Sequence, residues 1–136
     1  MSTADAKAIV RRFHETISRD NLAIIDELVS PEYVSHVPAF AGHSQEEVRQ
    51  YFAAMFEAFP DMHFTIEDVV AEGDKVAVRL AYHGTMPTSM MDNEDAVTGT
   101  SLAILRVVDG RIVESWGEAA TQRRVVAYGP NIRPKE

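Results

Sequence analysis

The hydrophobic pattern of this chain changes its period once, near Asp61. Up to that residue, apolar side chains recur at spacings of three and four, as they do along one face of an α-helix. Beyond it they alternate with polar residues, which is typical of β-strands with one buried face. This change predicts three helices followed by four strands, and therefore an α+β domain in which helices pack against a curved antiparallel sheet.

Capping residues and prolines set the limits of the predicted helices. Thr3 and Asn21 are in suitable positions to cap the first two helices, and Ser44 with Glu47 forms a capping box at the start of the third. Prolines follow the second and third helices, and a helix usually ends before such a residue. The predicted helices cover about residues 4–18, 22–29 and 45–59.

The four predicted strands are rich in β-branched residues and cover about residues 64–71, 76–84, 98–107 and 112–120. Two short connections, around Gly73 and around Asp109-Gly110, join the first strand to the second and the third to the fourth. Such short turns predict antiparallel hairpins. Between the two hairpins, a loop at 86–96 carries several methionines, including Met90, and is either a lid over an apolar ligand or a surface loop.

The composition predicts a single domain over residues 1–136, with a core at about 5–120 and a C-terminal extension at 121–136. The formal charge is -8, which argues against nucleic acid as a partner, because phosphates would be repelled. There is no cysteine and no apolar run long enough to span a membrane. We therefore expect a cytoplasmic protein with neither membrane nor nucleic-acid partners.

The last predicted strand carries the residues that most resemble a catalytic site. Alternation places Glu114, Trp116 and Glu118 on one face of this strand. If that face lines a pocket, burial beside the indole would raise the pKa of Glu118 and make it a general acid or base. If it is solvated, the two glutamates would instead pair with cations such as Arg79 or Arg106.

His36 is the second candidate, because it ends an apolar segment that also contains Tyr33. It would serve as a pocket base or hydrogen-bond donor, or would only pin the loop to the backbone. The five histidines show none of the close spacings of a metal site, and His14 and His43 are expected at the surface or near helix caps. The sequence predicts no metal and no cofactor.

Five segments together resemble the SnoaL-like polyketide cyclase family, which belongs to the nuclear transport factor 2-like superfamily. They are residues 10–13 (VRRF), 28–36 (LVSPEYVSH), 59–68 (FPDMHFTIED), 71–79 (AEGDKVAVR) and 109–116 (DGRIVESW). The resemblance implies a cone-shaped sheet around helices, an apolar pocket, and assembly as a homodimer or higher homo-oligomer. It also implies cofactor-free ring closure, in which an aspartate of the last strand takes and returns a proton.

That aspartate has no counterpart after Trp116, where the chain reads Gly117, Glu118, Ala119 and Ala120. Our first hypothesis is an acid/base enzyme, an aldol-type cyclase, isomerase or dehydratase, acting on a hydrophobic polyketide- or terpenoid-like molecule. Glu118 and His36 are its candidate acid/base groups, and the predicted pocket walls are Tyr33, Trp116, Tyr51, Met55, Phe59 and Met90. The alternatives are a non-catalytic binding or accessory protein with the same pocket, and a dimerising scaffold without one.

Overall fold

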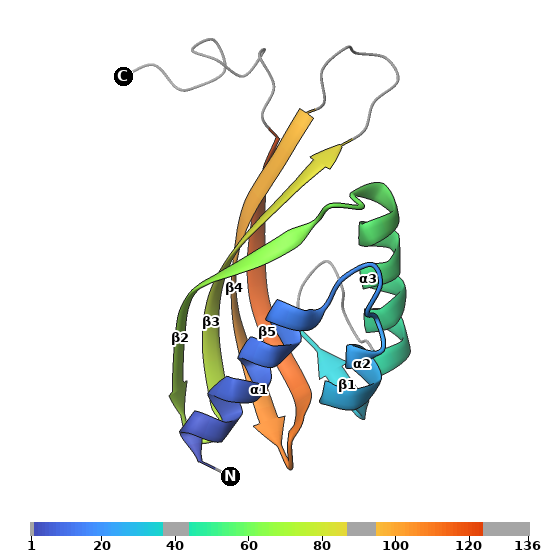
Figure 1. Cartoon of the computed structure of the whole chain (residues 1–136). Coiled ribbons are helices and arrows are strands. Elements are labelled where there is room, and N and C mark those ends of the chain that lie inside the picture. Colours follow the sequence, from blue (N-terminus) through green and yellow to red (C-terminus); the bar gives the residue numbers. More distant parts are fainter. Residues whose placement is uncertain (1, 37–43, 87–94, 124–136) are drawn as a thin grey trace, which may run out of the picture.

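The computed structural model describes residues 2–36, 44–86 and 95–123 of the chain, with the backbone alone at 86, 95–97 and 118–123. Three helices pack on one face of a five-stranded sheet (Figure 1). The elements are α1 (Thr3–Thr16), α2 (Ile24–Leu28), β1 (Val29–Ser35), α3 (Gln45–Ala58), β2 (His63–Glu72), β3 (Lys75–Met86), β4 (Asp95–Val108) and β5 (Arg111–Arg123). The predicted α+β class is confirmed.

The sheet is mixed and not, as the sequence predicted, purely antiparallel, because it contains an additional parallel strand, β1, which the sequence analysis did not predict. The strand order is β1-β5-β4-β3-β2; β1 pairs with β5 in parallel, and the other neighbours are antiparallel. The segment that forms β1 contains Pro31, which offers no backbone N–H, and its register with β5 is irregular. The sequence pattern of β1 therefore resembled that of a loop between two helices.

The two predicted hairpins are present, and their turns show why glycine and aspartate occur there. Glu72 pairs with Lys75 across a turn in which Gly73 has a φ of 62°. Val108 pairs with Arg111 across Asp109 and Gly110, whose φ angles are 53° and 81°. Positive φ at both central residues is the requirement of a type I′ turn, which matches the twist of the strands.

The N-caps follow the sequence prediction at α3 but not at α1 or at α2, where the N-cap is Ala23 and not Asn21. The Ser44 hydroxyl accepts a hydrogen bond from the Glu47 backbone N–H, as predicted. Helix α1 is capped by Ser2 instead of Thr3, because the Ser2 hydroxyl and the Asp5 carboxylate each accept a backbone N–H of the other residue. Among the described residues, no helix is both long and apolar enough to cross a membrane.

The helices define an inner and an outer face of the sheet. On β3, Val76, Val78 and Leu80 are buried beneath the helices, whereas Lys75 and Arg79 are exposed on the other side. The core combines this inner face with α1, α2 and part of α3, and its largest fully buried side chains include Phe56, Ile25, Ile112, Val10 and Val107. The outer face has no helix over it among the described residues.

His14 is partly buried with its ring among aromatic side chains, against the expectation of a surface position. Its ring packs edge-on against Phe13 and Phe64, with centroid distances of 5.1 and 6.4 Å. Its Nδ1 donates a hydrogen bond to the Val10 carbonyl at 3.0 Å. Burial among these rings lowers the pKa of His14 to about 4, and the hydrogen bond to Val10 only partly opposes this effect.

This lowered pKa predicts an acid-sensitive fold. As the pH falls from about 6.5 to about 4, the unfolded chain takes up a proton at His14 while the folded chain does not, so the free energy of unfolding should decrease by roughly 1 to 3 kcal/mol. Urea titrations at the two ends of this range should show a smaller decrease in His14→Gln than in the wild type. The exposed His63 is the control, and an equal decrease in His14→Gln and His63→Gln would contradict the assignment.

Candidate functional site

The side chains of the inner face are fully buried at one end of the sheet, which we call its closed end, and only partly buried at the other. Near the turn between β2 and β3, Val76 and Val78 are completely buried under α1. Toward the other end, five large side chains of β2, β3 and the α3 segment face the core but remain partly exposed: Phe52, Met55, Phe59, Phe64 and Tyr82. We call these five the apolar chamber. Partly exposed, inward-facing aromatic side chains of this kind are typical of a ligand pocket.

Helix α3 forms one wall of the chamber, because most of the apolar side chains on this helix are not fully covered by other parts of the protein. Only Val48 and Phe56 of α3 are buried, and the helix packs mainly against β1 and α2. Phe52 bridges to the opposite wall, with its ring centroid 6.3 Å from that of Phe64. Tyr51, Met55 and Phe59, which the sequence predicts as pocket walls, therefore lie on the helix that borders the chamber.

Tyr33, the fourth predicted wall residue, lies at the closed end of the inner face. Its side chain is buried, and its hydroxyl hydrogen-bonds the buried Ser115 hydroxyl of β5 at 2.5 Å. This contact joins β1 to β5 from inside the sheet. The Tyr33 phenol therefore has a structural role, because the hydroxyl groups of Tyr33 and Ser115 would each be buried without a hydrogen-bond partner if the other were absent.

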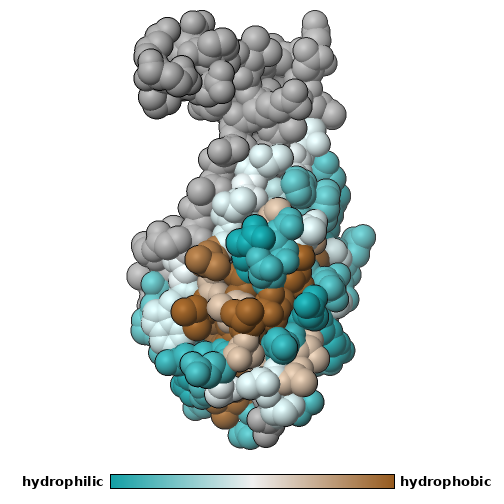
Figure 2. Space-filling model, turned by 90° about the vertical axis from the view of Figure 1, so that its left-hand side faces the viewer, coloured by the Kyte–Doolittle hydropathy of each residue, from teal (hydrophilic) through white to brown (hydrophobic). Residues whose placement is uncertain are grey.

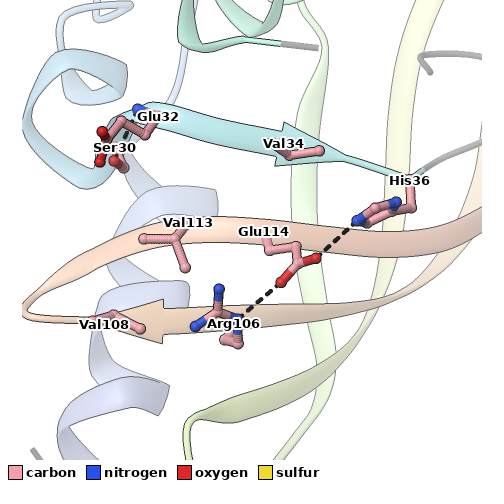
Figure 3. A pocket seen from close by; sticks show the side chains of 8 residues that line it. All are labelled: Ser30, Glu32, Val34, His36, Arg106, Val108, Val113 and Glu114. Carbon is pink, nitrogen blue, oxygen red and sulfur yellow. Dashed lines mark hydrogen bonds and ion pairs between the residues drawn. The ribbon is translucent and has the colours of Figure 1, made fainter. Parts of the chain in front are cut away.

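A second hollow lies on the outer face, over β1, β5 and β4 (Figure 3). We call it the outer groove; its volume is about 400 Å³, and it is lined by Ser30, Glu32, Val34, His36, Arg106, Val108, Val113 and Glu114. A bulge in β5 shapes it: Arg106 pairs with Glu114 and Val107 with Ile112, so Val113 is an extra residue. Val113 and Glu114 consequently both line the groove.

Glu114 joins the polar residues of the outer groove into one chain. Its carboxylate accepts hydrogen bonds from Arg106 Nε at 2.9 Å and from His36 Nε2 at 2.8 Å (Figure 3). The bond from Arg106, followed by that from His36, holds the pKa of Glu114 below its ordinary value. A carboxylate held in this way is a poor proton acceptor, but it fixes the orientation of the imidazole.

The indole of Trp116 belongs to this outer face. Its ring stacks on His36, with centroids 5.2 Å apart and an interplanar angle of 14°, and Lys75 Nζ lies 5.5 Å from the ring centroid. Trp116 also pairs in register with Ile104, which is exposed. The face that the sequence singles out is therefore the one turned away from the helices.

The structure thus divides the predicted site residues between two faces of the sheet. His36 and Trp116 lie outside, whereas Tyr33, Tyr51, Met55 and Phe59 lie on the helical side. The backbone of Glu118 lies in β5 opposite Leu102, but its side chain is outside the described part of the chain, as is the whole of Met90. The predicted pairing of Glu114 with Arg106 is present.

Sequence reasoning did not select Tyr82 or His14 as partly buried residues. Tyr82 follows the alternation of β3 and could have been placed on the inner face by counting from Val76. His14 gave no such signal, because it lies at the edge of the apolar stripe of α1. Among the described residues, no three His, Asp or Glu side chains gather as a metal ion would require.

Comparison with known proteins agrees with this architecture. The family model for the SnoaL-like polyketide cyclases matches residues 7–121. AclR from Streptomyces galilaeus, which is proposed to be a hydroxylase, is 26% identical, with a TM-score of 0.76 over 88% of this chain and 91% of its own. IdmH from Streptomyces antibioticus, which is proposed to be a polyketide cyclase, is 27% identical, with a TM-score of 0.75 over 84% and 91%.

The same fold occurs in a protein from Bacillus cereus that is proposed to be a polyketide cyclase. It is 25% identical, with a TM-score of 0.72 over 85% of this chain and 74% of its own. No curated protein matches the chain significantly. Because the family model covers most of the sequence, the chain belongs to the SnoaL-like polyketide cyclase family.

Proposed function

We propose that this protein is a cofactor-independent acid/base enzyme that binds a hydrophobic polyketide- or terpenoid-like ketone in the apolar chamber. The reaction would be an aldol-type cyclisation, an isomerisation or a dehydration, each of which begins with removal of a proton next to a carbonyl group. The observation that carries this proposal is the set of inward-facing but partly exposed aromatic side chains within a fold of this family.

The proton-transfer groups remain those predicted from the sequence, Glu118 and His36. The two make different demands on the ligand. His36 is oriented by Glu114 in the outer groove, so it would serve only a ligand that reaches that face. Glu118 pairs in register with Leu102, farther along β5 than the groove, so it would serve a ligand at that end of the strand. A cytoplasmic location also remains a prediction.

Exchange of hydrogen for deuterium in 2-tetralone, a bicyclic ketone, tests this chemistry directly. In D₂O, the wild type should accelerate exchange next to the carbonyl group, as followed by proton NMR. Loss of the acting base should slow it by about a hundredfold or more. Slowing in Glu118→Gln alone would assign the reaction to β5, and slowing in His36→Ala alone would assign it to the outer groove; unchanged exchange in both variants would contradict both assignments.

The alternative is a non-catalytic binding or accessory protein that uses the same chamber. One observation favours it: position 117, next to Trp116 on β5, is a glycine, and a Cβ there would approach the Leu102 carbonyl oxygen to 2.9 Å. Strand β5 is therefore packed too closely against β4 at position 117 to carry an acidic side chain there. Binding of ketones without any exchange of 2-tetralone would support this alternative.

Binding of 2-methylnaphthalene tests whether the chamber is the ligand site. Phe52→Ser should weaken binding about tenfold in calorimetric titrations, because an aromatic contact surface is lost. Ile104→Ser is the matched control, since it removes an apolar side chain from the outer face and should leave the affinity unchanged. The reverse result, weakening in Ile104→Ser alone, would place the ligand on the outer face.

The outer face also supports the predicted homodimer. Val70, Ala77, Ile104 and Trp116 are paired in register across four neighbouring strands, and with the adjacent Leu102 they form an apolar band. Val70 is 63% exposed, Leu102 59% and Ile104 42%. Figure 2 shows a hydrophobic patch ringed by hydrophilic residues on this side of the molecule. Large exposed patches with polar rims are typical of protein interfaces.

The rims of this band carry both signs of charge, which favours a second copy of the chain as the partner. The ion pair of Arg79 with Asp68 flanks the band on one side, and that of Arg106 with Glu114 flanks it on the other. A two-fold arrangement brings the same patch of both subunits together, so that opposite charges can meet.

Light scattering during size exclusion tests the dimer. The wild type should elute with the mass of two chains. Ile104→Glu should elute as a monomer, because it would bury an unpaired carboxylate in the interface. Ala53→Glu makes a comparable change at an exposed position of α3 and should remain dimeric. A dimeric Ile104→Glu, or a monomeric wild type, would show that this face is not the interface.

A further inference from the structure

Tyr51 and Tyr82 contact the two phenylalanines, Phe52 and Phe64, that face each other across the apolar chamber. Tyr51 extends from α3, with its ring edge-on to Phe52 at a centroid distance of 5.3 Å. Tyr82 extends from the inner face of β3, with its ring 6.4 Å from that of Phe64. A charge on Tyr82 would also disfavour one on Tyr51, in agreement with this shared aromatic contact. Two phenol hydroxyl groups therefore border a chamber whose other side chains are apolar.

Gly99 of β4 fixes the position of the Tyr82 phenol. The two residues are direct partners in the antiparallel register, and the Tyr82 ring lies flat over the glycine. A Cβ at position 99 would lie 2.2 Å from Cζ and 2.3 Å from Oη of Tyr82. Any side chain larger than hydrogen would displace the phenol, so the glycine defines where this hydroxyl lies.

Tyr51 is a half-exposed residue whose phenol is partly desolvated. Tyr51 as a whole is 49% exposed, yet burial raises the pKa of its phenol, with the nearby Tyr82 as a smaller cause. A tyrosine is protonated at neutral pH, and the raised pKa preserves this state, so the phenol can donate a hydrogen bond.

We propose that Tyr51 and Tyr82 form an oxygen-binding subsite, in which their hydroxyl groups hold the carbonyl or phenolic oxygen of a flat, hydrophobic ligand. This inference rests on the proposed function, because it takes the apolar chamber as the ligand site. The aromatic walls provide contact surface for the ring system, and the phenols orient it by its oxygen. A few convergent polar groups in an apolar pocket are the usual source of such orientation.

The subsite would recognise oxygen without using charge. A phenol carries one donor and also accepts, so its hydroxyl can turn from a neighbour in the protein to a ligand oxygen. In an apolar site, a hydrogen bond to a ligand oxygen that would otherwise be buried without a partner contributes strongly to discrimination. An analogue that lacks the oxygen should therefore bind less tightly, although its apolar contacts are the same.

Calorimetric titrations with 2-naphthol and 2-methylnaphthalene test this discrimination, because the two probes differ mainly by a hydroxyl in place of a methyl group. The wild type should bind 2-naphthol about tenfold more tightly, and Tyr51→Phe and Tyr82→Phe should each weaken that binding about threefold. Binding of 2-methylnaphthalene should not change in either variant. Tyr33→Phe is the matched control, since its phenol bonds Ser115 in the core, and it should retain the preference.

Gly99→Ala offers an independent variant, since it keeps both phenols but displaces that of Tyr82, and it should also lose the preference. A wild type without preference, or a preference that survives in the Tyr51→Phe, Tyr82→Phe double variant, would overturn the subsite. Failure to bind either probe would overturn the subsite together with the chamber as the ligand site. A clear preference for 2-naphthol without exchange of 2-tetralone would support the subsite. It would refute only the proposed catalysis.

Discussion

The parallel pairing of β1 with β5 is the contact on which the rest of the molecule depends. It joins the helical half of the chain to the strand half, and α3 packs against β1. On the inside it is held by the hydrogen bond between Tyr33 and Ser115, and on the outside His36 meets Glu114. The chamber wall and the outer groove are therefore both positioned by a single short strand.

The sequence predicted the regular elements well and this pairing not at all. Periodicity, the Ser44 cap and the Asp109-Gly110 turn act locally, so they can be read from neighbouring residues. Strand β1 is stabilised by residues about eighty positions away, and its short pattern contains a proline. The same limit applies to His14, whose partly buried position follows from its contact with Phe64 on another element.

Alternation placed Glu114 and Trp116 correctly on one face of β5, but it could not determine which face meets the helices. That choice depends on the bulge at Val113 and on the side from which α1 packs. The result separates two chemistries. Charged residues and the indole lie outside, next to the apolar band, whereas neutral aromatic residues and phenols lie inside. An interface and a ligand site can thus use the two faces without competing.

The interior also constrains what kind of polar group can act there. The burial that lowers the pKa of His14 to about 4 disfavours charge near Phe64, one of the chamber residues. An ionised carboxylate placed among the same rings would meet the same desolvation cost, and its pKa would rise. Phenols avoid that cost because they bind oxygen while neutral. In a chain without the family's aspartate after Trp116, recognition by Tyr51 and Tyr82 is the arrangement that this environment favours.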